Sequence, residues 1–184
     1  QSVTKTFVVA QPDILAATVA KTNVTCNAAN DGTITVSGAT GGWDSYEYRL
    51  NLGIWQSSGA FTALAPGTYS VQIRDASNIS CVKDLGNQVI TQPVALSASI
   101  SAQTNVACNG ASTGSATVSV TGGTTSYTYS WNTSTVQTTA TATGLAAGTY
   151  TVTVADANNC STTAQVTITQ PATITSSVSS QTNV

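Results

Sequence analysis

Hydrophobic and polar residues alternate with a period of two in many short segments of this chain. Residues 46–50 read Tyr-Glu-Tyr-Arg-Leu, and residues 127–131 read Tyr-Thr-Tyr-Ser-Trp. Successive side chains of a β-strand point to opposite faces, so the apolar residues of each segment share one face. No helical periodicity competes with this pattern. The sequence therefore predicts an all-β protein.

The expected strands are short and follow each other in the same order in both halves of the chain. A more variable hairpin arm is expected around residues 54–55 in the first half and 136–142 in the second. Seven or so strands joined by turns within about 80 residues predict an immunoglobulin-like β-sandwich. The clearest strands are residues 15–19, 33–36, 46–50 and 67–75, and their counterparts 96–100, 116–120, 127–131 and 148–156.

One stretch, Gly-Thr-Tyr-(Ser/Thr)-Val-x-(Ile/Val)-x-Asp-Ala, occurs twice and shows that the chain is a tandem repeat. Tyr69 and Tyr150 are 81 positions apart, and so are Asp75 and Asp156. Each copy leads to a cysteine and then to (Val/Ile)-Thr-Gln-Pro. A period of this size indicates two tandem domains rather than one large fold.

Gln-Pro marks each junction, at Pro12, Pro93 and Pro171. Proline fixes φ and keeps the preceding residue extended, so short, stiff junctions and an extended array of domains are expected. The predicted parts are 1–12, the final strand of a preceding repeat; 13–93 and 94–171, two whole repeats; and 172–184, the start of a following repeat. The chain is therefore interpreted as an internal fragment of a longer protein.

Composition excludes several classes of function. Charged residues make up 7% of the chain, against roughly 25% in an ordinary soluble domain. The formal net charge is −2 with five Lys plus Arg, which offers no footprint for nucleic acid or an anionic membrane. Histidine, the commonest general base and metal ligand, is absent. No apolar stretch is long enough to span a membrane. We expect no catalytic residues, no cofactor and no membrane insertion.

Four cysteines indicate the redox environment. Cys26 and Cys81 lie in the first repeat, and Cys108 and Cys160 in the second. Four cysteines allow three pairings, of which the repeat symmetry favours Cys26–Cys81 and Cys108–Cys160. Four buried free thiols are the alternative, whereas a zinc site lacks both CxxC and histidine. Disulfide bonds indicate an oxidising, extracellular location.

A few further residues are candidates for ligand binding. Asp75 and Asp156 end equivalent strands before Ala-x-Asn, which is typical of an Asx turn; the alternative is a calcium site. Tyr48, Leu50, Tyr129 and Trp131 are expected in the core rather than on a sugar-binding face. Trp43, with Thr124 as its counterpart, is the exposed aromatic and the weak ligand-binding candidate. Tyr69 and Tyr150 are predicted to be corner residues whose hydroxyls bond back to the chain.

Taken together, the motifs resemble the SprB repeat, a module found in many copies in very large surface adhesins of gliding bacteria. The first unit departs by two extra residues between Asp75 and Cys81 and by Leu50 in place of Trp131. The motifs are Val-x-Cys-Asn at 24–27 and 106–109, Gly-Gly at 41–42 and 122–123, Tyr-x-Tyr-x-(Leu/Trp) at 46–50 and 127–131, Leu-x-x-Gly-Thr-Tyr at 64–69 and 145–150, and Asp-x-x-x-Cys at 156–160.

The resemblance implies type IX secretion, display on the cell surface, and adhesion or gliding motility as the role of the parent protein. We therefore expect a non-enzymatic module of a long filament. Its expected partners are neighbouring repeats, other filaments, and external surfaces or polysaccharide. The alternative is a carbohydrate- or ligand-binding module repeated for avidity. A site repeated for avidity should recur in both repeats, whereas Trp43 does not.

Overall fold

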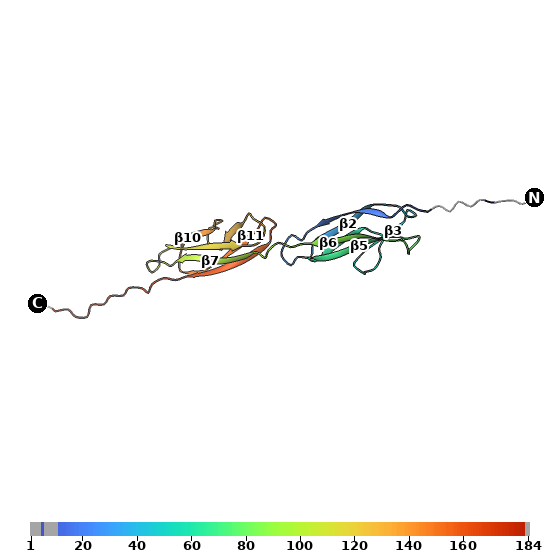
Figure 1. Cartoon of the computed structure of the whole chain (residues 1–184). Coiled ribbons are helices and arrows are strands. Elements are labelled where there is room, and N and C mark those ends of the chain that lie inside the picture. Colours follow the sequence, from blue (N-terminus) through green and yellow to red (C-terminus); the bar gives the residue numbers. More distant parts are fainter. Residues whose placement is uncertain (1–4, 6–10, 183–184) are drawn as a thin grey trace, which may run out of the picture. The chain divides into compact units, whose positions relative to one another are not determined.

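The computed structural model of the chain describes residue 5 and residues 11–182. The chain divides into two compact units, Gln1–Pro93 and Val94–Val184. Within the described residues each unit contains six strands and no helix, and every strand pairing is antiparallel (Figure 1). The prediction of an all-β fold is confirmed.

The first unit consists of two three-stranded sheets. One sheet has the order β1-β2-β4 and the other β3-β5-β6. Strands β1, β2 and β4 therefore correspond to A, B and E of an immunoglobulin-like sandwich, and β3, β5 and β6 to C, F and G. The strands are β1 (Ala16–Thr22), β2 (Gly32–Thr40), β3 (Tyr46–Leu50), β4 (Ala60–Leu64), β5 (Gly67–Asp75) and β6 (Val82–Ile90).

The second unit repeats this topology. Its sheets have the orders β7-β8-β10 and β9-β11-β12. The strands are β7 (Ser97–Thr104), β8 (Gly114–Thr121), β9 (Thr128–Trp131), β10 (Thr141–Leu145), β11 (Gly148–Ala155) and β12 (Ser161–Ile168).

In each unit the two sheets enclose one hydrophobic core. Ile34 of β2 and Ile73 of β5 are fully buried in the first unit and belong to the same core cluster. In the second unit Ala116 of β8 belongs to the corresponding cluster together with Val152 of β11 and Trp131 of β9. The alternating burial along the strands follows the sequence pattern. The immunoglobulin-like sandwich is confirmed.

A tyrosine corner fixes the connection into the central strand of the second sheet. The hydroxyl of Tyr69 donates a hydrogen bond to the carbonyl oxygen of Ala65 at 2.9 Å, and Tyr150 donates to Ala146 at 3.2 Å. This is the arrangement expected at the corner between strands E and F of immunoglobulin-like domains. The predicted role of these two tyrosines is confirmed.

The variable hairpin arm forms less regular structure than predicted. Around residue 55 only one isolated bridge joins Tyr48 to Gln56, so six strands form instead of seven. The side chain of Gln56 explains the difference, because its amide donates to the carbonyl oxygens of Ser58 and Ala60. A side-chain hydrogen bond thus replaces part of a backbone ladder.

The segments outside the two sandwiches bear on the predicted flanking repeats. Of residues 1–12, assigned to the final strand of a preceding repeat, 1–4 and 6–10 lie outside the described residues, and Gln11 and Pro12 belong to no strand. Residues 172–182 form no strand either. The flanking repeats remain a prediction.

Candidate functional site

The N-terminal end of the first unit, where the chain enters the sandwich, is built around a buried carboxylate. Asp75 has an exposed fraction of 0%. Its Oδ2 accepts a hydrogen bond from the backbone N–H of Trp43 at 2.5 Å, and its Oδ1 accepts from the N–H groups of Ser77 at 2.7 Å and Asn78 at 3.0 Å. One side chain therefore joins the loop after β2 to the turn after β5.

Asp156 repeats this arrangement in the second unit, where 4% of its surface is exposed. The backbone N–H of Thr124 donates to its Oδ2 at 2.8 Å, and those of Asn158 and Cys160 donate to its Oδ1 at 2.9 Å. The carboxylate thus spans two loops that are 32 residues apart in sequence.

These hydrogen bonds keep both carboxylates ionised. Burial by itself raises the pKa of Asp75, but the N–H groups of Trp43, Asn78 and Ser77 outweigh it and hold the pKa below its ordinary value. For Asp156 the N–H of Thr124 is the largest influence, and the pKa is lowered as well. A carboxylate surrounded by N–H donors caps turns, which favours the Asx-turn interpretation over calcium binding.

A Gly-Gly loop next to each aspartate admits the incoming chain. Gly42 has φ +65°, and a Cβ added there would lie 2.4 Å from Oδ2 of Asp75. Its backbone N–H donates to the carbonyl oxygen of Asp13 at 2.9 Å. In the second unit the N–H of Gly123 donates to the carbonyl oxygen of Val94 at 2.8 Å. The loop thus forms an N-terminal clamp on the residue just after Gln-Pro.

At the opposite end of each unit, the Cys-Asn loop grips the outgoing Gln-Pro motif. The side-chain amide of Asn27 donates to the carbonyl oxygen of Pro93 at 3.0 Å, and the N–H of Ala28 donates to Oε1 of Gln92 at 2.8 Å. We call this the C-terminal clamp. The second unit has the same two bonds, from Asn109 to Pro171 at 3.0 Å and from Gly110 to Gln170 at 2.8 Å.

The two clamps leave no free linker between the units. Pro93 is bonded by Asn27 within the first unit, and the next residue, Val94, is bonded by Gly123 within the second. Consecutive residues of the chain therefore belong to different domains. This observation gives a physical basis to the short junctions predicted from the prolines.

The cysteines lie at opposite ends of each unit, so the predicted pairings within repeats are wrong. Cys26 belongs to the loop next to the C-terminal clamp, whereas the carbonyl oxygen of Cys81 accepts from the N–H of Asp75 at 3.0 Å, at the N-terminal end. The length of β5 separates these ends by roughly 26 Å, and a disulfide bond requires Cα atoms within about 7 Å.

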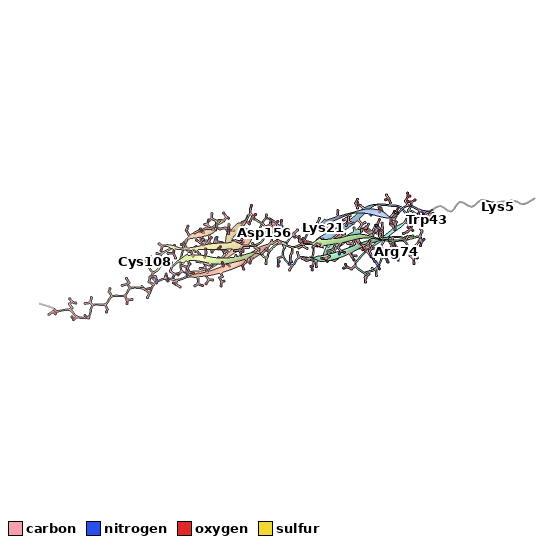
Figure 2. The ribbon with its side chains drawn as sticks, viewed as in Figure 1. Lys5, Lys21, Trp43, Arg74, Cys108 and Asp156 are labelled. Carbon is pink, nitrogen blue, oxygen red and sulfur yellow. The ribbon has the colours of Figure 1, made fainter. Side chains whose placement is uncertain are left out.

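The bonding states of the cysteines agree with this geometry. Cys26 and Cys160 each take part in a disulfide bond, whereas Cys81 and Cys108 are free thiols. Figure 2 shows Cys108 and Asp156 at opposite ends of the second unit, and Cys160 is hydrogen-bonded to Asp156. In both units the partner suggested by repeat symmetry is therefore out of reach.

Comparison with known families bears directly on these features. Residues 18–53 and 100–136 match the family model of the SprB repeat. Two segments of the chain thus match the SprB repeat. The resemblance seen in the motifs is confirmed for these segments, which run from β1 to just after β3 and from β7 to just after β9.

Each matched segment contains the two loops that donate the clamp hydrogen bonds, whereas the residues that they hold lie outside the segment. The Cys-Asn motif supplies Asn27 and Asn109, which donate to the carbonyl oxygens of the Gln-Pro prolines. The Gly-Gly motif lies against the buried aspartate and holds the incoming chain. Within each unit, the motifs therefore hold the chain where it enters and where it leaves the sandwich.

Two further comparisons give little additional information. The chain is similar to the C-terminal 282-residue fragment of intimin, solved in complex with the intimin-binding domain of the translocated intimin receptor. The sequence identity is 18% and the TM-score 0.36, with 88% of this chain and 64% of that chain covered. The chain thus spans less than two thirds of that fragment, and so loose a likeness carries no argument. No curated protein matches the chain.

Trp43 lies at the N-terminal end of the first unit, at the far end of that unit from Lys21 (Figure 2). About half of its surface, 53%, is exposed. With Pro12, Ile14, Cys81 and other residues it lines a hollow of about 340 Å³. The structure thus places the predicted exposed aromatic in a mainly apolar hollow next to the N-terminal clamp.

Sequence reasoning missed a cluster on the outer face of β3 and β5 in the first unit. The guanidinium groups of Arg49 and Arg74 lie 4.4 and 4.5 Å from the ring centroid of Trp55, and Arg74 also pairs with Glu47 at 2.6 Å. Each contact contributes roughly 0.5–1 kcal/mol at an exposed site. The counterparts in the second repeat are Thr128, Ser130, Val136 and Ala155. The alternation at residues 46–50 indicates that Glu47 and Arg49 share the polar face of the strand. It does not indicate that Trp55 packs against that face.

Two classes of site find no support in the described residues. Over residues 11–182, no three His, Cys, Asp or Glu side chains lie close enough together to hold a metal ion. The same part of the chain has no helix long and apolar enough to cross a membrane.

Acidification is expected to destabilise both units through their buried aspartates. The pKa values of Asp75 and Asp156 are lower in the folded protein than the ordinary 3.8. Their contribution to stability is therefore present above about pH 4 and is lost as the pH falls through the folded pKa. Circular dichroism melts between pH 7 and pH 2 measure this loss as a falling Tm.

Asp156→Asn provides the control for this prediction. The variant keeps the shape of the side chain but loses an acceptor, so the Tm of the second unit at pH 7 should fall by roughly 5 °C or more. Its Tm should also depend less on pH below 4. Hydrogen exchange measured by mass spectrometry shows which of the two units has lost stability. If the Tm of the second unit fell with pH equally in the variant and in the original protein, the Asp156 carboxylate would be excluded as the source of the acid destabilisation.

Proposed function

We propose that this chain is a non-enzymatic stalk segment of a long cell-surface adhesin. The observation that carries the proposal is the junction at Pro93 and Val94, where consecutive residues are bonded into different domains. A linker of this kind restricts the motion of one repeat against the next, as a spacer requires. Its role is to hold a distal binding region away from the cell.

The topology of each unit suits a module under tension. The first strand, β1, and the last, β6, both run from the N-terminal end to the C-terminal end of the first unit. A pull on the two termini therefore acts along both strands in opposite directions. Each strand is held by a full antiparallel ladder, β1 by β2 and β6 by β5, whose hydrogen bonds share the load instead of opening one by one.

Cell-surface location and adhesion are the finer parts of the proposal. The disulfide-bonded Cys26 and Cys160 support an oxidising, extracellular compartment. Export by the type IX route and a role in surface attachment or gliding motility follow from the resemblance to SprB repeats. The proposed contacts of the filament are neighbouring filaments, external surfaces and polysaccharide. The low charge of the chain suits contacts that do not depend on electrostatics.

A ligand-binding module is the second candidate, and the hollow beside Trp43 is the observation that favours it. Thr124 replaces Trp43 in the second repeat, so the hollow cannot supply one binding site per repeat. In addition, the guanidinium groups of Arg49 and Arg74 already cover the ring of Trp55, so that ring is not open to a sugar. The stalk role therefore explains more of the shared residues than repeated carbohydrate binding does.

The stiffness of the junction can be tested by ¹⁵N NMR relaxation on the whole chain. We expect both units to report one common, strongly anisotropic rotational diffusion tensor. A matched variant carries Gly-Ser-Gly-Ser-Gly between Pro93 and Val94, and its units should tumble separately with shorter correlation times. If the original chain already shows two independent tensors, the stalk proposal fails.

A further inference from the structure

We propose that Asn109 in the second unit is a site of deamidation, the conversion of asparagine to aspartate or isoaspartate, and that the C-terminal clamp of that unit controls the reaction. Asn109 and Gly110 form the only Asn-Gly pair of the sequence. In such a pair the backbone nitrogen of the glycine can attack the side-chain carbonyl carbon of the asparagine, because no Cβ obstructs its approach. The loop and the segment that it holds both belong to the second unit.

The reaction balances with water as its only co-reactant. The backbone nitrogen of Gly110 forms a bond to Cγ of Asn109, and the bond from Cγ to Nδ2 breaks. Nδ2 leaves as ammonia, which takes up the proton of the Gly110 N–H. Water then opens the resulting cyclic imide at either of its two carbonyl carbons. The product carries a carboxylate in place of the amide, and no group is oxidised or reduced.

The clamp holds both nitrogen atoms that take part. The N–H of Gly110, which contains the attacking nitrogen, donates to Oε1 of Gln170 at 2.8 Å. Nδ2 of Asn109, the leaving group, donates to the carbonyl oxygen of Pro171 at 3.0 Å. The attacking nitrogen must lose its proton, and the side chain must turn toward it, so both bonds oppose the reaction. Deamidation therefore proceeds from the state in which the clamp is open.

The position of the pair makes such opening a local event. Asn109 and Gly110 are exposed, and so are Gln170 and Pro171. Asn109 also lines a hollow of about 430 Å³ beside Pro171, and a Cβ added to Gly110 would meet no atom within 4 Å. Exposed hydrogen bonds at the end of a domain open at a lower free energy than the core strands. The clamp can therefore open, and water can reach the imide, while the sandwich stays folded.

Deamidation removes the donor on which the clamp depends. A carboxylate at residue 109 has no N–H, and its oxygens would face the carbonyl oxygen of Pro171, which is also an acceptor. The adjoining bonds do not involve the modified group. Thr169 donates to Oδ1 of Asn105 at 3.0 Å, and its carbonyl oxygen accepts from the N–H of Val106 at 2.9 Å. The modification thus releases the Gln-Pro segment permanently but leaves the end of β12 attached.

The first unit supplies a matched comparison, because it has the same clamp without the glycine. The corresponding pair is Asn27-Ala28, and the N–H of Ala28 donates to Oε1 of Gln92 at 2.8 Å. Ala28 also has a left-handed backbone, with φ 59°, as Gly110 has with φ 79°. The methyl group of alanine hinders attack by its own nitrogen. Asn27 should therefore keep its amide under conditions in which Asn109 reacts.

Peptide mapping by mass spectrometry after incubation of the whole chain tests the proposal. Replacement of –NH₂ by –OH should accumulate at Asn109, and faster at pH 9 than at pH 7, because base removes the proton of the attacking nitrogen. Gln170→Ala removes the acceptor of the Gly110 N–H. It should speed the reaction roughly two- to tenfold, the shift in the opening equilibrium that one hydrogen bond produces.

Gln92→Ala is the control, since it makes the same change in the first unit and should leave the rate at Asn109 unchanged. No reaction at Asn109 would overturn the proposal. Equal rates in Gln170→Ala and in the original chain would show that the clamp does not control the reaction, which overturns it as well.

Exchange of the residues after the two asparagines tests the role of glycine. Ala28→Gly should make Asn27 reactive, and Gly110→Ala should protect Asn109, with both clamps otherwise intact. If Asn27 reacted as fast as Asn109 in the original chain, glycine would not determine the site and the assignment would fail. Hydrogen exchange of each variant shows whether its two units are folded.

The effect on the clamp is measured with Asn109→Asp, which contains the product's carboxylate from the start. Hydrogen exchange of the Gly110 N–H should be faster than in the original chain, whereas the N–H groups of Val106 and Thr169 should stay protected. Unchanged exchange at Gly110 would show that the clamp survives the modification and would contradict its proposed consequence.

This inference goes beyond the stalk role and stands or falls separately. Deamidation is detected by mass within the second unit, whereas junction stiffness is measured by NMR relaxation of both units. A stiff junction in a chain that never deamidates would leave the stalk and remove this site. Reaction at Asn109 under clamp control in a chain whose units tumble independently would do the reverse.

Discussion

Replacing Trp131 by alanine is expected to destabilise the second unit by about 3–5 kcal/mol, the usual cost of truncating a large buried aromatic side chain. Trp131 is 1% exposed and is the largest fully buried side chain of the protein's described residues. It pairs directly with Val152 of β11, and its indole N–H donates to the carbonyl oxygen of Thr139 at 3.0 Å. Truncation removes this packing and leaves that carbonyl without its donor.

Leucine at the same position provides the matched control, because the first unit has Leu50 there and folds in the same way. Trp131→Leu should cost clearly less than Trp131→Ala, since it keeps most of the apolar volume. Urea denaturation followed by circular dichroism gives the free energies, and hydrogen exchange assigns them to a unit. Equal costs for the two variants, or faster exchange mainly in the first unit, would contradict the placement of Trp131 in the core.

The fold was largely predictable because its signals are local. The alternation at residues 46–50 places Tyr48 in the core, and β3 (Tyr46–Leu50) has these same bounds. The corner tyrosines, Tyr69 and Tyr150, were predicted because the position of a tyrosine at the start of strand F is characteristic of the sandwich. Backbone pattern and turn chemistry act over a few residues, so a single sequence reveals them.

The cysteine pairing failed because repeat symmetry says which residues are equivalent, not which are close. Cys26 follows the first strand and Cys81 precedes the sixth. In an antiparallel sandwich, a loop after strand A and a loop before strand G lie at opposite ends. The order of the strands along the sequence therefore argues against the Cys26–Cys81 pairing, whereas the spacing of the cysteines does not.

The clamps were missed for a different reason. Gln-Pro and Cys-Asn were both recognised as motifs, but they are separated by about 65 residues and meet only when the sandwich is closed. Hydrogen bonds such as those from Asn27 to Pro93 and from Ala28 to Gln92 have no local sequence signature. The sequence gives one indirect sign of these bonds, because Cys-Asn and Gln-Pro occur together once in each repeat. The second unit has the same bonds, from Asn109 to Pro171 and from Gly110 to Gln170.

Replacing Gly122 by alanine is the second change for which we expect a large effect, a destabilisation of the second unit by about 2–5 kcal/mol. Gly122 has φ +71°, which costs an L-residue roughly 1–2 kcal/mol. An added Cβ would also lie 2.0 Å from the carbonyl oxygen of Ala95. Forcing an atom into packed backbone costs typically 1–3 kcal/mol more. The loop must therefore move away from the incoming chain at Ala95.

Gly144→Ala separates the two causes. Gly144 has nearly the same φ, +67°, but nothing lies within 4 Å of its added Cβ, so only the backbone term applies and a loss of about 1–2 kcal/mol is expected. Trp131 is the only tryptophan of residues 94–184. In a background with Trp43→Phe and Trp55→Phe, its fluorescence therefore follows urea unfolding of the second unit alone.

The Gly122→Ala variant also links stability to the junction. The neighbouring Gly123 holds Val94 through its N–H, and Gly122 accepts the hydroxyl of Tyr127 at 2.6 Å. Displacing the loop should weaken the N-terminal clamp, so the two units should tumble more independently at temperatures where both remain folded. Gly144→Ala should leave the tumbling unchanged. Equal losses of stability in both variants would show that the positive φ alone requires glycine at residue 122. Unchanged tumbling in Gly122→Ala would show that the Gly-Gly loop does not stiffen the junction.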